Sequence, residues 1–287
     1  MSFATGKPPH LSRRRALVGG AAVLAMSLVT AFVPGSSLAG DQLPTQSDML
    51  NVETMEISFN EDFATLDVSA WGPGTRWIAH TPWAGDFGGA RFANPDERSP
   101  FRIVDGKLHI EAKRDPEGDW QSGLLASVDA DGNGFSQQYG YFEMRARLPE
   151  GPGVWPAFWL IGRDRSKATA EIDVIEFYGD KPEGYSSVVH VWHRDGRHYS
   201  RFHRNAVFVE ARPGAFHTYG VKVDPGWIRF YFNREFVWKT ETQPEHRQPL
   251  YILLNLALVD GPTKDDTPDP SHMIVDYVRA YRLDRDL

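Results

Sequence analysis

Apolar and polar residues alternate along much of the chain after about residue 55. In "GKLHIEA" (106–112), Leu108, Ile110 and Ala112 fall on one face and the residues between them fall on the other. "YFEMRARL" (141–148) alternates in the same way. Side chains of a β-strand point to opposite faces in turn, so each segment predicts a strand with one buried face.

Further segments of this kind follow, and turn residues such as Gly and Pro separate them. They are "WIRFYFNREFVWKT" (227–240), which reads as a hairpin turning at Asn233 to Glu235, "YILLNLAL" (251–258) and "HMIVDYVRAYRL" (272–283). The periodicity of a long helix does not appear. Many antiparallel strands of this length predict an all-β protein of two packed antiparallel sheets, a β-sandwich or jelly roll. No repeat interrupts the pattern, so we expect one domain over 55–287.

The first 54 residues have a different composition. A basic stretch at Arg13–Arg15 precedes an apolar run from Ala16 to Val33, and small residues follow at Ser37–Ala39. This order predicts an export signal over 1–39, and the Ser-Arg-Arg core resembles a twin-arginine signal. An uncleaved membrane anchor is the alternative, because the run approaches the minimum length for spanning a bilayer. Residues 40–54 are polar and predict a short linker.

Charge and composition exclude several function classes. The chain has 31 Lys and Arg against 38 Asp and Glu, a net charge of −7, which argues against a nucleic-acid partner. It has no cysteine, so disulfides, thiolate catalysis and cysteine-based metal sites are excluded. After cleavage of the signal we expect an acidic monomer without membrane contact, located in the periplasm or outside the cell.

The segment "ATAEIDVIEFYGD" (168–180) breaks the simple alternation. In a regular strand both faces would mix acidic with large apolar side chains, and neither would pack cleanly. One extra residue, a β-bulge at Val174–Ile175, shifts every later side chain to the other face. Glu171, Asp173 and Glu176 then share one face with Tyr178, and the apolar residues share the opposite one. The sorting predicts the bulge.

The three acids on one face predict a specific chemistry. Glu171 and Glu176 lie roughly 13 Å apart between Cα atoms at about 3.3 Å per residue. Side chains that lean together can approach the separation of about 5–5.5 Å found in retaining glycosidases, where one carboxylate attacks and the other is the acid/base. Asp173 between them adds charge, so at least one pKa is expected to rise. A solvated strand face and a divalent-metal site are the alternatives, although a flat patch is a poor metal cage.

Aromatic residues near this segment favour a carbohydrate ligand. Sugar rings stack their C–H faces on flat aromatic side chains. Trp155 and Trp159 lie upstream, and His190 and Trp192 share one predicted strand face downstream. Two tryptophans in a loop-like stretch are expected at the rim of a cleft. They are Trp77 and Trp83.

The segment "EIDVIE" resembles the E-[IV]-D-x-x-E signature of glycoside hydrolase family 16, in its bulged, laminarinase-like branch. The resemblance extends in order over about 57–283. It includes "SFNEDFATLDVSAW", "VDGKLHIEAKR", "QYGYFEMRARLPEGPGVWPAFWLIG", "FHTYGVKVDPGWIRFYFNREFVW", "LYILLNLAL" and "MIVDYVRAYR".

The resemblance implies a β-jelly roll with a concave glycan cleft and endo-acting hydrolysis of β-glycosidic bonds with retention. By position, Glu171 would be the nucleophile, Asp173 its helper and Glu176 the acid/base. Substrate-binding positions would be Trp83, Trp155, Trp159, His190, Trp192 and Asn255. No cofactor is required for catalysis. A structural calcium ion held by Asp276 is implied on the convex side, and a salt-bridged surface acid is the alternative reading of Asp276.

Two stretches leave the substrate open between a β-glucan and a bacterial exopolysaccharide. "NLALVDGPTKDDTPDP" (255–270) departs from the family pattern beside the cleft. "HRDGRHYSRFHR" (193–204) carries four arginines, which read either as a solvated hairpin or as a site for acidic substituents of a glycan.

Three rival functions follow from the same residues. A transglycosylase would use the same chemistry and pass the sugar to another sugar. A non-catalytic carbohydrate-binding sandwich would keep the fold alone. A metal-dependent enzyme is disfavoured, because clustered histidines with ligand spacing do not appear on a common strand or helix.

Overall fold

The computed structural model of the protein describes residues 44–96, 98–209, 212–261 and 266–283. The predicted export signal (1–39) and the first residues of the predicted linker lie outside these ranges. Within the described part, no helix has the length and the apolar character needed to cross a membrane.

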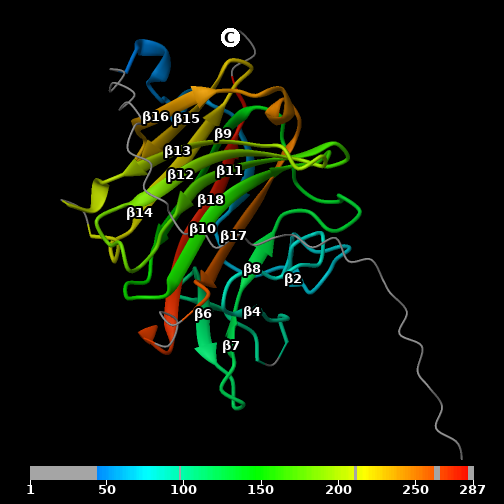
Figure 1. The fold of residues 1–287 in the computed structure, drawn as a ribbon, viewed down its shortest axis with the longest axis vertical. Helices are drawn as coiled ribbons and strands as arrows, with labels where there is room; N and C mark the ends of the chain where they lie inside the picture. The colour runs from blue at the N-terminus through cyan, green and yellow to red at the C-terminus, as the bar shows by residue number, and fades with distance from the viewer. Residues whose placement is uncertain (1–43, 97, 210–211, 262–265, 284–287) are drawn as a thin grey trace, which may run out of the picture. The chain divides into compact units, whose positions relative to one another are not determined.

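The described residues form two large, mostly antiparallel β-sheets (Figure 1). The ten-stranded sheet runs in the order β16 (Glu235–Glu241), β15 (Trp227–Phe232), β14 (His217–Val223), β9 (Gly140–Arg147), β18 (Ser271–Tyr281), β6 (Lys107–Arg114), β7 (Trp120–Ser122) and β4 (Arg91–Phe92), with β1 (Ile57–Glu61) paired to β18 and β5 (Phe101–Val104) paired to β6. The eight-stranded sheet runs in the order β13 (His198–Asn205), β12 (Tyr185–His193), β11 (Ala168–Glu176), β10 (Val154–Gly162), β17 (Leu250–Leu258), β8 (Leu124–Ala126), β3 (Trp77–Ile78) and β2 (Val68–Ser69). Two short 3-10 helices, η1 (Gln46–Asp48) and η2 (Val52–Thr54), precede the first strand. Two more, η3 (Val207–Val209) and η4 (Pro244–His246), lie between strands.

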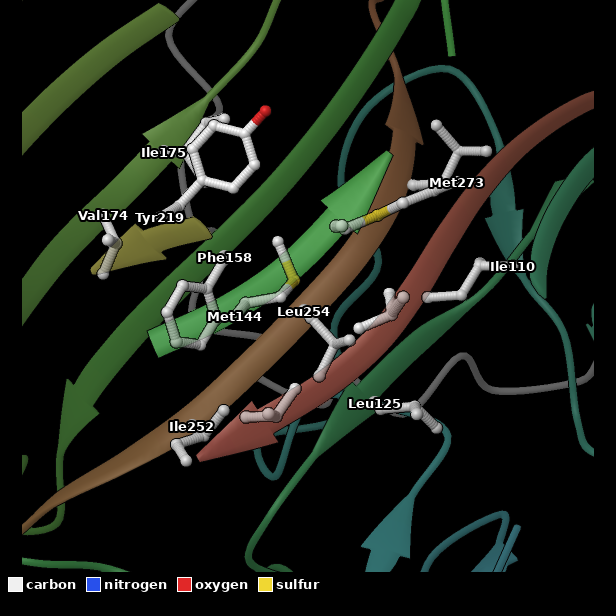
Figure 2. Packing of buried hydrophobic residues seen from close by; sticks show 14 of the residues in the cluster. Ile110, Leu125, Met144, Phe158, Val174, Ile175, Tyr219, Ile252, Leu254 and Met273 are labelled. Atoms are coloured by element: carbon white, nitrogen blue, oxygen red, sulfur yellow. The ribbon is translucent and has the colours of Figure 1, made fainter. Parts of the chain in front are cut away.

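The main hydrophobic core lies between the two sheets. Figure 2 shows Phe158 of β10 and Leu254 of β17 on the eight-stranded side, and Met144 of β9 and Ile110 of β6 on the ten-stranded side. All four side chains are fully buried. The predicted sandwich is therefore confirmed, because each alternating strand contributes its apolar face to one shared core.

The predicted hairpin over 227–240 is formed by β15 and β16. Phe232 pairs with Glu235, and the two residues between them, Asn233 and Arg234, both have positive φ angles of 50° and 67°. This is the backbone conformation of the tight turns that join twisted antiparallel strands. The guanidinium of Arg234 donates two hydrogen bonds, of 3.0 and 2.7 Å, to the buried carboxylate of Glu143 and so ties the turn to β9.

The described part of the predicted linker is docked on the domain, which the sequence pattern did not indicate. Asp48 of η1 is fully buried and accepts hydrogen bonds of 2.7 Å from Arg229 Nε and from Lys239 Nζ. A small apolar cluster lies beside it on the outer face of the ten-stranded sheet. It contains Leu50, Val52, Met55, Tyr141, Tyr231, Phe236 and Tyr281. Residues 44–54 are therefore part of the folded domain.

Replacing Asp48 by asparagine is expected to destabilise the domain by about 3 kcal/mol at pH 7, because it removes the carboxylate that pairs with Lys239 and leaves Arg229 with Asp224 alone. Burial alone would raise the pKa of Asp48, but the bonds from Lys239, Thr45 and Arg229 outweigh it and hold the pKa well below the usual range. The stabilisation is therefore present above the ordinary aspartate pKa of about 4 and is lost as the pH falls below it.

Urea unfolding at pH 7 and near pH 3 measures both effects. The difference in the free energy of unfolding between wild type and Asp48→Asn should be smaller at the lower pH. Glu53→Gln, which changes an exposed acid in the same segment, is the control and should unfold like wild type at both pH values. Equal unfolding midpoints for Asp48→Asn and Glu53→Gln at pH 7 would contradict the docking role of Asp48.

Candidate active site

The predicted β-bulge is present in β11. Against β10, Asp173 pairs with Trp159 and Ile175 pairs with Phe158, so Val174 is the extra residue between them. The pairing of β11 with β12 shifts at the same place, between Asp173 and Glu176. The Ser187 hydroxyl donates a hydrogen bond of 3.0 Å to the carbonyl oxygen of Val174, which satisfies a group that the bulge removes from the regular ladder.

The bulge separates the acids from the core. Four apolar side chains of this segment are buried in the main core: Ile172, Val174, Ile175 and Phe177. Asp173 is 6% exposed and both glutamates are half-buried on the opposite face of the sheet. Both Val174 and Ile175 face the core, so the extra residue adds apolar burial and also brings Glu176 to the side of Glu171.

Glu176 is held by two donors on one oxygen. Trp155 Nε1 donates to Glu176 Oε1 at 3.1 Å, and the Tyr178 hydroxyl donates to the same oxygen at 3.0 Å. The Trp155 and Tyr178 rings stack with centroids 5.5 Å apart. The two bonds fix the orientation of the carboxyl group. Its other oxygen, Oε2, receives neither of them.

Glu171 is fixed by a donor from the neighbouring strand. Trp192 Nε1 on β12 donates to Glu171 Oε2 at 2.6 Å. On the backbone side, the imidazole Nε2 of the fully buried His246 lies 3.2 Å from the carbonyl oxygen of Glu171. Each glutamate therefore has its own tryptophan donor, from β10 for Glu176 and from β12 for Glu171.

Asp173 lies between the glutamates and faces His190, which is paired with His198. His190 Nε2 is 3.6 Å from Asp173 Oδ2, and His190 Nδ1 is 2.9 Å from His198 Nε2. Burial, with contributions from His198 and His246, lowers the pKa of His190 to about 4. His190 is therefore neutral at pH 7, and its contact with Asp173 is not an ion pair at that pH.

Burial raises the pKa of all three acids. It raises the pKa of Glu171 to about 7, against the bond from Trp192 and with a contribution from the Glu176 charge. It raises the pKa of Asp173 well above the usual range, and both glutamates add to the effect. It also raises the pKa of Glu176, against the bonds from Tyr178 and Trp155. The three groups titrate together, and the cluster keeps its protons to higher pH than isolated carboxyl groups would.

The predicted aromatic residues differ in their exposure to solvent. Trp155 and Trp83 are half-buried beside the acids' face, and Trp192 is 44% exposed. Trp159 is only 6% exposed, because Trp83 and Phe87 pack against it edge to face. It lies largely beneath the surface that a ligand can contact.

Two residues that the sequence predicts at the cleft are buried in the structure. Trp77 was expected at the cleft rim, but it is fully buried between the sheets and donates to Glu61 Oε2 at 3.0 Å. Asn255 was expected to bind substrate, but it is fully buried and accepts a 2.9 Å bond from Trp159 Nε1. The pairing of β17 with β10 sets Asn255 opposite Ala157, between Trp155 and Trp159 on the same face, so its amide oxygen orients Trp159.

Sequence reasoning did not assign roles to four residues that complete the site: Tyr178, His198, His246 and Phe87. Tyr178 had a visible signal, because the bulge places it two positions after Glu176 on the acids' face. The other three come from segments far apart in the sequence and had none.

Three of the four arginines in 193–204 pair with other groups of the protein. Arg194 donates to the carbonyl oxygen of Arg165, Arg197 pairs with Asp195 at 2.9 Å, and Arg204 pairs with Glu183 at 2.8 Å. Arg201 stands opposite the core residue Val189 and so lies on the other face of β13 from the acids. The arrangement favours the solvated hairpin over a site for acidic substituents.

The surroundings of Asp276 do not fit a calcium site. Arg145 Nη1 lies 2.5 Å from one carboxylate oxygen of Asp276, and Lys107 Nζ lies 3.6 Å from the other. Two cations therefore occupy the oxygens that would bind a metal ion. Across the described ranges, no group of three or more acidic or histidine side chains is arranged to hold a metal. The structure thus favours the salt-bridged reading of Asp276.

The chain resembles known proteins in sequence and in fold. It is 32% identical over 276 residues to Endo-1,3-1,4-beta-glycanase ExsH and to Endo-1,3-1,4-beta-glycanase EglC, both of Rhizobium meliloti (strain 1021). Each match covers 88% of this chain and 57% of the relative, so the chain spans about half the length of these curated relatives. The crystal structure of laminarinase from Flavobacterium sp. UMI-01 has a TM-score of 0.60 and 21% identity, covering 79% of this chain and 100% of that one.

Residues 97–279 match the glycosyl hydrolases family 16. This span holds β11 with its three acids and most strands of both sheets. The chain belongs to the glycosyl hydrolases of family 16.

Proposed function

We propose that this protein is an endo-acting glycoside hydrolase that cleaves internal β-glycosidic bonds with retention of configuration. The observation that carries the proposal is the bulge at Val174, which gathers three acids on one sheet face, with a separate donor on each glutamate. Two carboxyl groups in different hydrogen-bond environments suit the two roles of a retaining glycosidase.

In this mechanism Glu171 is the nucleophile and Glu176 is the acid/base. A carboxylate oxygen of Glu171 forms a bond to the anomeric carbon while the bond between that carbon and the glycosidic oxygen breaks. The glycosidic oxygen takes the proton of Glu176. Glu176, now ionised, removes a proton from water, and the water oxygen displaces Glu171 from the anomeric carbon. Both side chains return to their starting states.

Asp173 is proposed to reduce repulsion between the two glutamates. Burial and the charges of both glutamates raise its pKa, so Asp173 keeps its proton to higher pH than an ordinary aspartate. While it is protonated, the cluster carries one negative charge fewer than three ionised acids would. This makes the ionised form of Glu171 easier to maintain beside Glu176. The role fits its position between the two glutamates along β11.

The proposed substrate is a β-glucan or a related bacterial exopolysaccharide. The printed names of the first relatives, which are endo-1,3-1,4-β-glycanases, support this class. The half-buried aromatic rings of Trp83 and Trp155 beside the acids support stacking with sugar rings. Export to the periplasm or the extracellular space, guided by residues 1–39, is part of the same proposal.

Replacing Glu171 by glutamine is expected to lower kcat by at least about a thousand-fold, because an amide cannot form the covalent intermediate. Release of reducing ends from laminarin, lichenan, agarose, carrageenan and acidic bacterial exopolysaccharides measures the activity and identifies the substrate. Asp180→Asn, an exposed acid that follows the same strand, is the control and should retain wild-type rates. If Glu171→Gln hydrolyses a polymer of the panel as fast as this control, the assignment of the nucleophile is wrong.

Replacing Tyr178 by phenylalanine is expected to move the basic limb of the pH–rate profile upward by about one pH unit, since the lost bond is to a charged group. The hydroxyl stabilises the ionised form of Glu176 and lowers its pKa, so its removal keeps Glu176 protonated to higher pH. The ring stack on Trp155 is preserved in the variant. A basic limb in kcat/KM that stays in place or moves downward would contradict the acid/base assignment.

A further inference from the structure

The imidazole of His198 contacts two neighbours of the acids at once. His198 lies on β13, the edge strand of the eight-stranded sheet, directly opposite Trp192 on β12. Its ring stacks on Trp192 with centroids 3.6 Å apart and an angle of 5°. Its Nε2 atom is 2.9 Å from His190 Nδ1.

The two partners of His198 lead to different acids. Trp192 donates through Nε1 to Glu171 Oε2 at 2.6 Å. His190 presents Nε2 to Asp173 Oδ2 at 3.6 Å. Catalytic hydrogen bonds are often long in a free enzyme and shorten when substrate binds, so this separation is compatible with a working contact.

We propose that His198 is a positioning residue that fixes Trp192 and His190 together and through them orients Glu171 and Asp173. The inference rests on the proposed function, because orientation of these acids matters for catalysis only if they react. His198 itself reaches neither acid and acts through its two partners.

The exposure of Trp192 explains why such a residue is needed. A tryptophan that is 44% exposed has few packing contacts to hold its rotamer, yet its indole N–H must meet one oxygen of Glu171. Stacking on a flat aromatic ring favours one orientation of the indole. The flat face of His198 supplies this stack from the neighbouring strand, and the rotamer of Trp192 is fixed without burying it.

The bond between His198 and His190 sets which nitrogen of His190 carries the proton. When His190 Nδ1 donates to His198, its Nε2 accepts and suits a protonated Asp173. When His198 donates, His190 Nε2–H donates and suits an ionised Asp173. The pair of histidines therefore accommodates Asp173 in either protonation state.

Three replacements of His198 separate the stack from the hydrogen bond. His198→Phe keeps the flat ring and loses the bond to His190. His198→Gln places an amide nitrogen near the former Nε2 position and loses the ring. His198→Ala loses both, and Tyr199→Phe on the other face of the same strand is the matched control.

The first readout does not require turnover. The indole N–H of Trp192, identified in a 1H–15N spectrum by its absence in Trp192→Phe, is shifted by its bond to a carboxylate. It should keep its position in His198→Phe and Tyr199→Phe, and move toward the position of a solvent-exposed indole in His198→Ala and His198→Gln. An unmoved signal in His198→Ala would overturn the proposal, whether or not any glycan is hydrolysed.

The second readout is the rate on the substrate found for wild type. Loss of one interaction of 0.5–1.5 kcal/mol corresponds to about a 2- to 12-fold fall in kcat/KM, expected for the Phe and Gln variants. For His198→Ala, kcat/KM should fall by the product of the factors for the Phe and Gln variants. The acidic limb of the profile should move upward in His198→Ala and His198→Gln, because the bond from Trp192 lowers the pKa of Glu171.

The two readouts distinguish this inference from the proposed function. Displacement of the Trp192 signal in a protein that hydrolyses no glycan would support the positioning role and reject the hydrolase assignment. Rates and acidic limbs equal to wild type in all three variants would reject the positioning role and leave the hydrolase assignment standing.

Discussion

The extra residue in β11 is the constraint on which the rest of the site depends. A regular strand would place Glu176 on the face opposite Glu171 and force its carboxyl group into the apolar core. The bulge at Val174 reverses the alternation once, so that apolar side chains go to the core and acids go to the other face. Ser187 from β12 satisfies the carbonyl group of Val174 that the bulge takes out of the regular ladder.

Three acids close together on a half-buried surface raise the free energy of the folded state, and hydrogen-bond donors from the neighbouring strands partly offset this. β10 supplies Trp155 to Glu176 and β12 supplies Trp192 to Glu171, each through an indole N–H that carries no charge. A neutral donor stabilises a carboxylate less than a cation does, so the pKa values stay high and protons remain available. The same arrangement that makes the acids unfavourable in the folded state gives them proton affinities useful near neutral pH.

The aromatic residues divide into those that support the site and those that form its surface. Trp159 and Asn255 are buried and hydrogen-bonded to each other, while Trp155 and Trp192 each combine a ring face with a hydrogen bond to a glutamate. A tryptophan that both donates to a reacting group and presents a flat face links the position of the acid to the position of the sugar ring. The edge strand β13 adds His198 to this system without adding a charge near the acids.

The sequence by itself determined the sandwich, because many separate segments alternate apolar and polar side chains. It also determined the bulge and the shared face of the three acids, because these follow from alternation within one strand. Periodicity reports which face a residue takes, and an acidic and an apolar face can be sorted within β11 alone. It does not report what lies across the sheet. The burial of Trp77, the bond from Trp159 to Asn255 and the docking of Asp48 on β15 and β16 depend on the pairing of distant segments. The contacts of His198 with Trp192 and His190 likewise exist only because β12 and β13 pair in one particular register, and that register is set by tertiary packing.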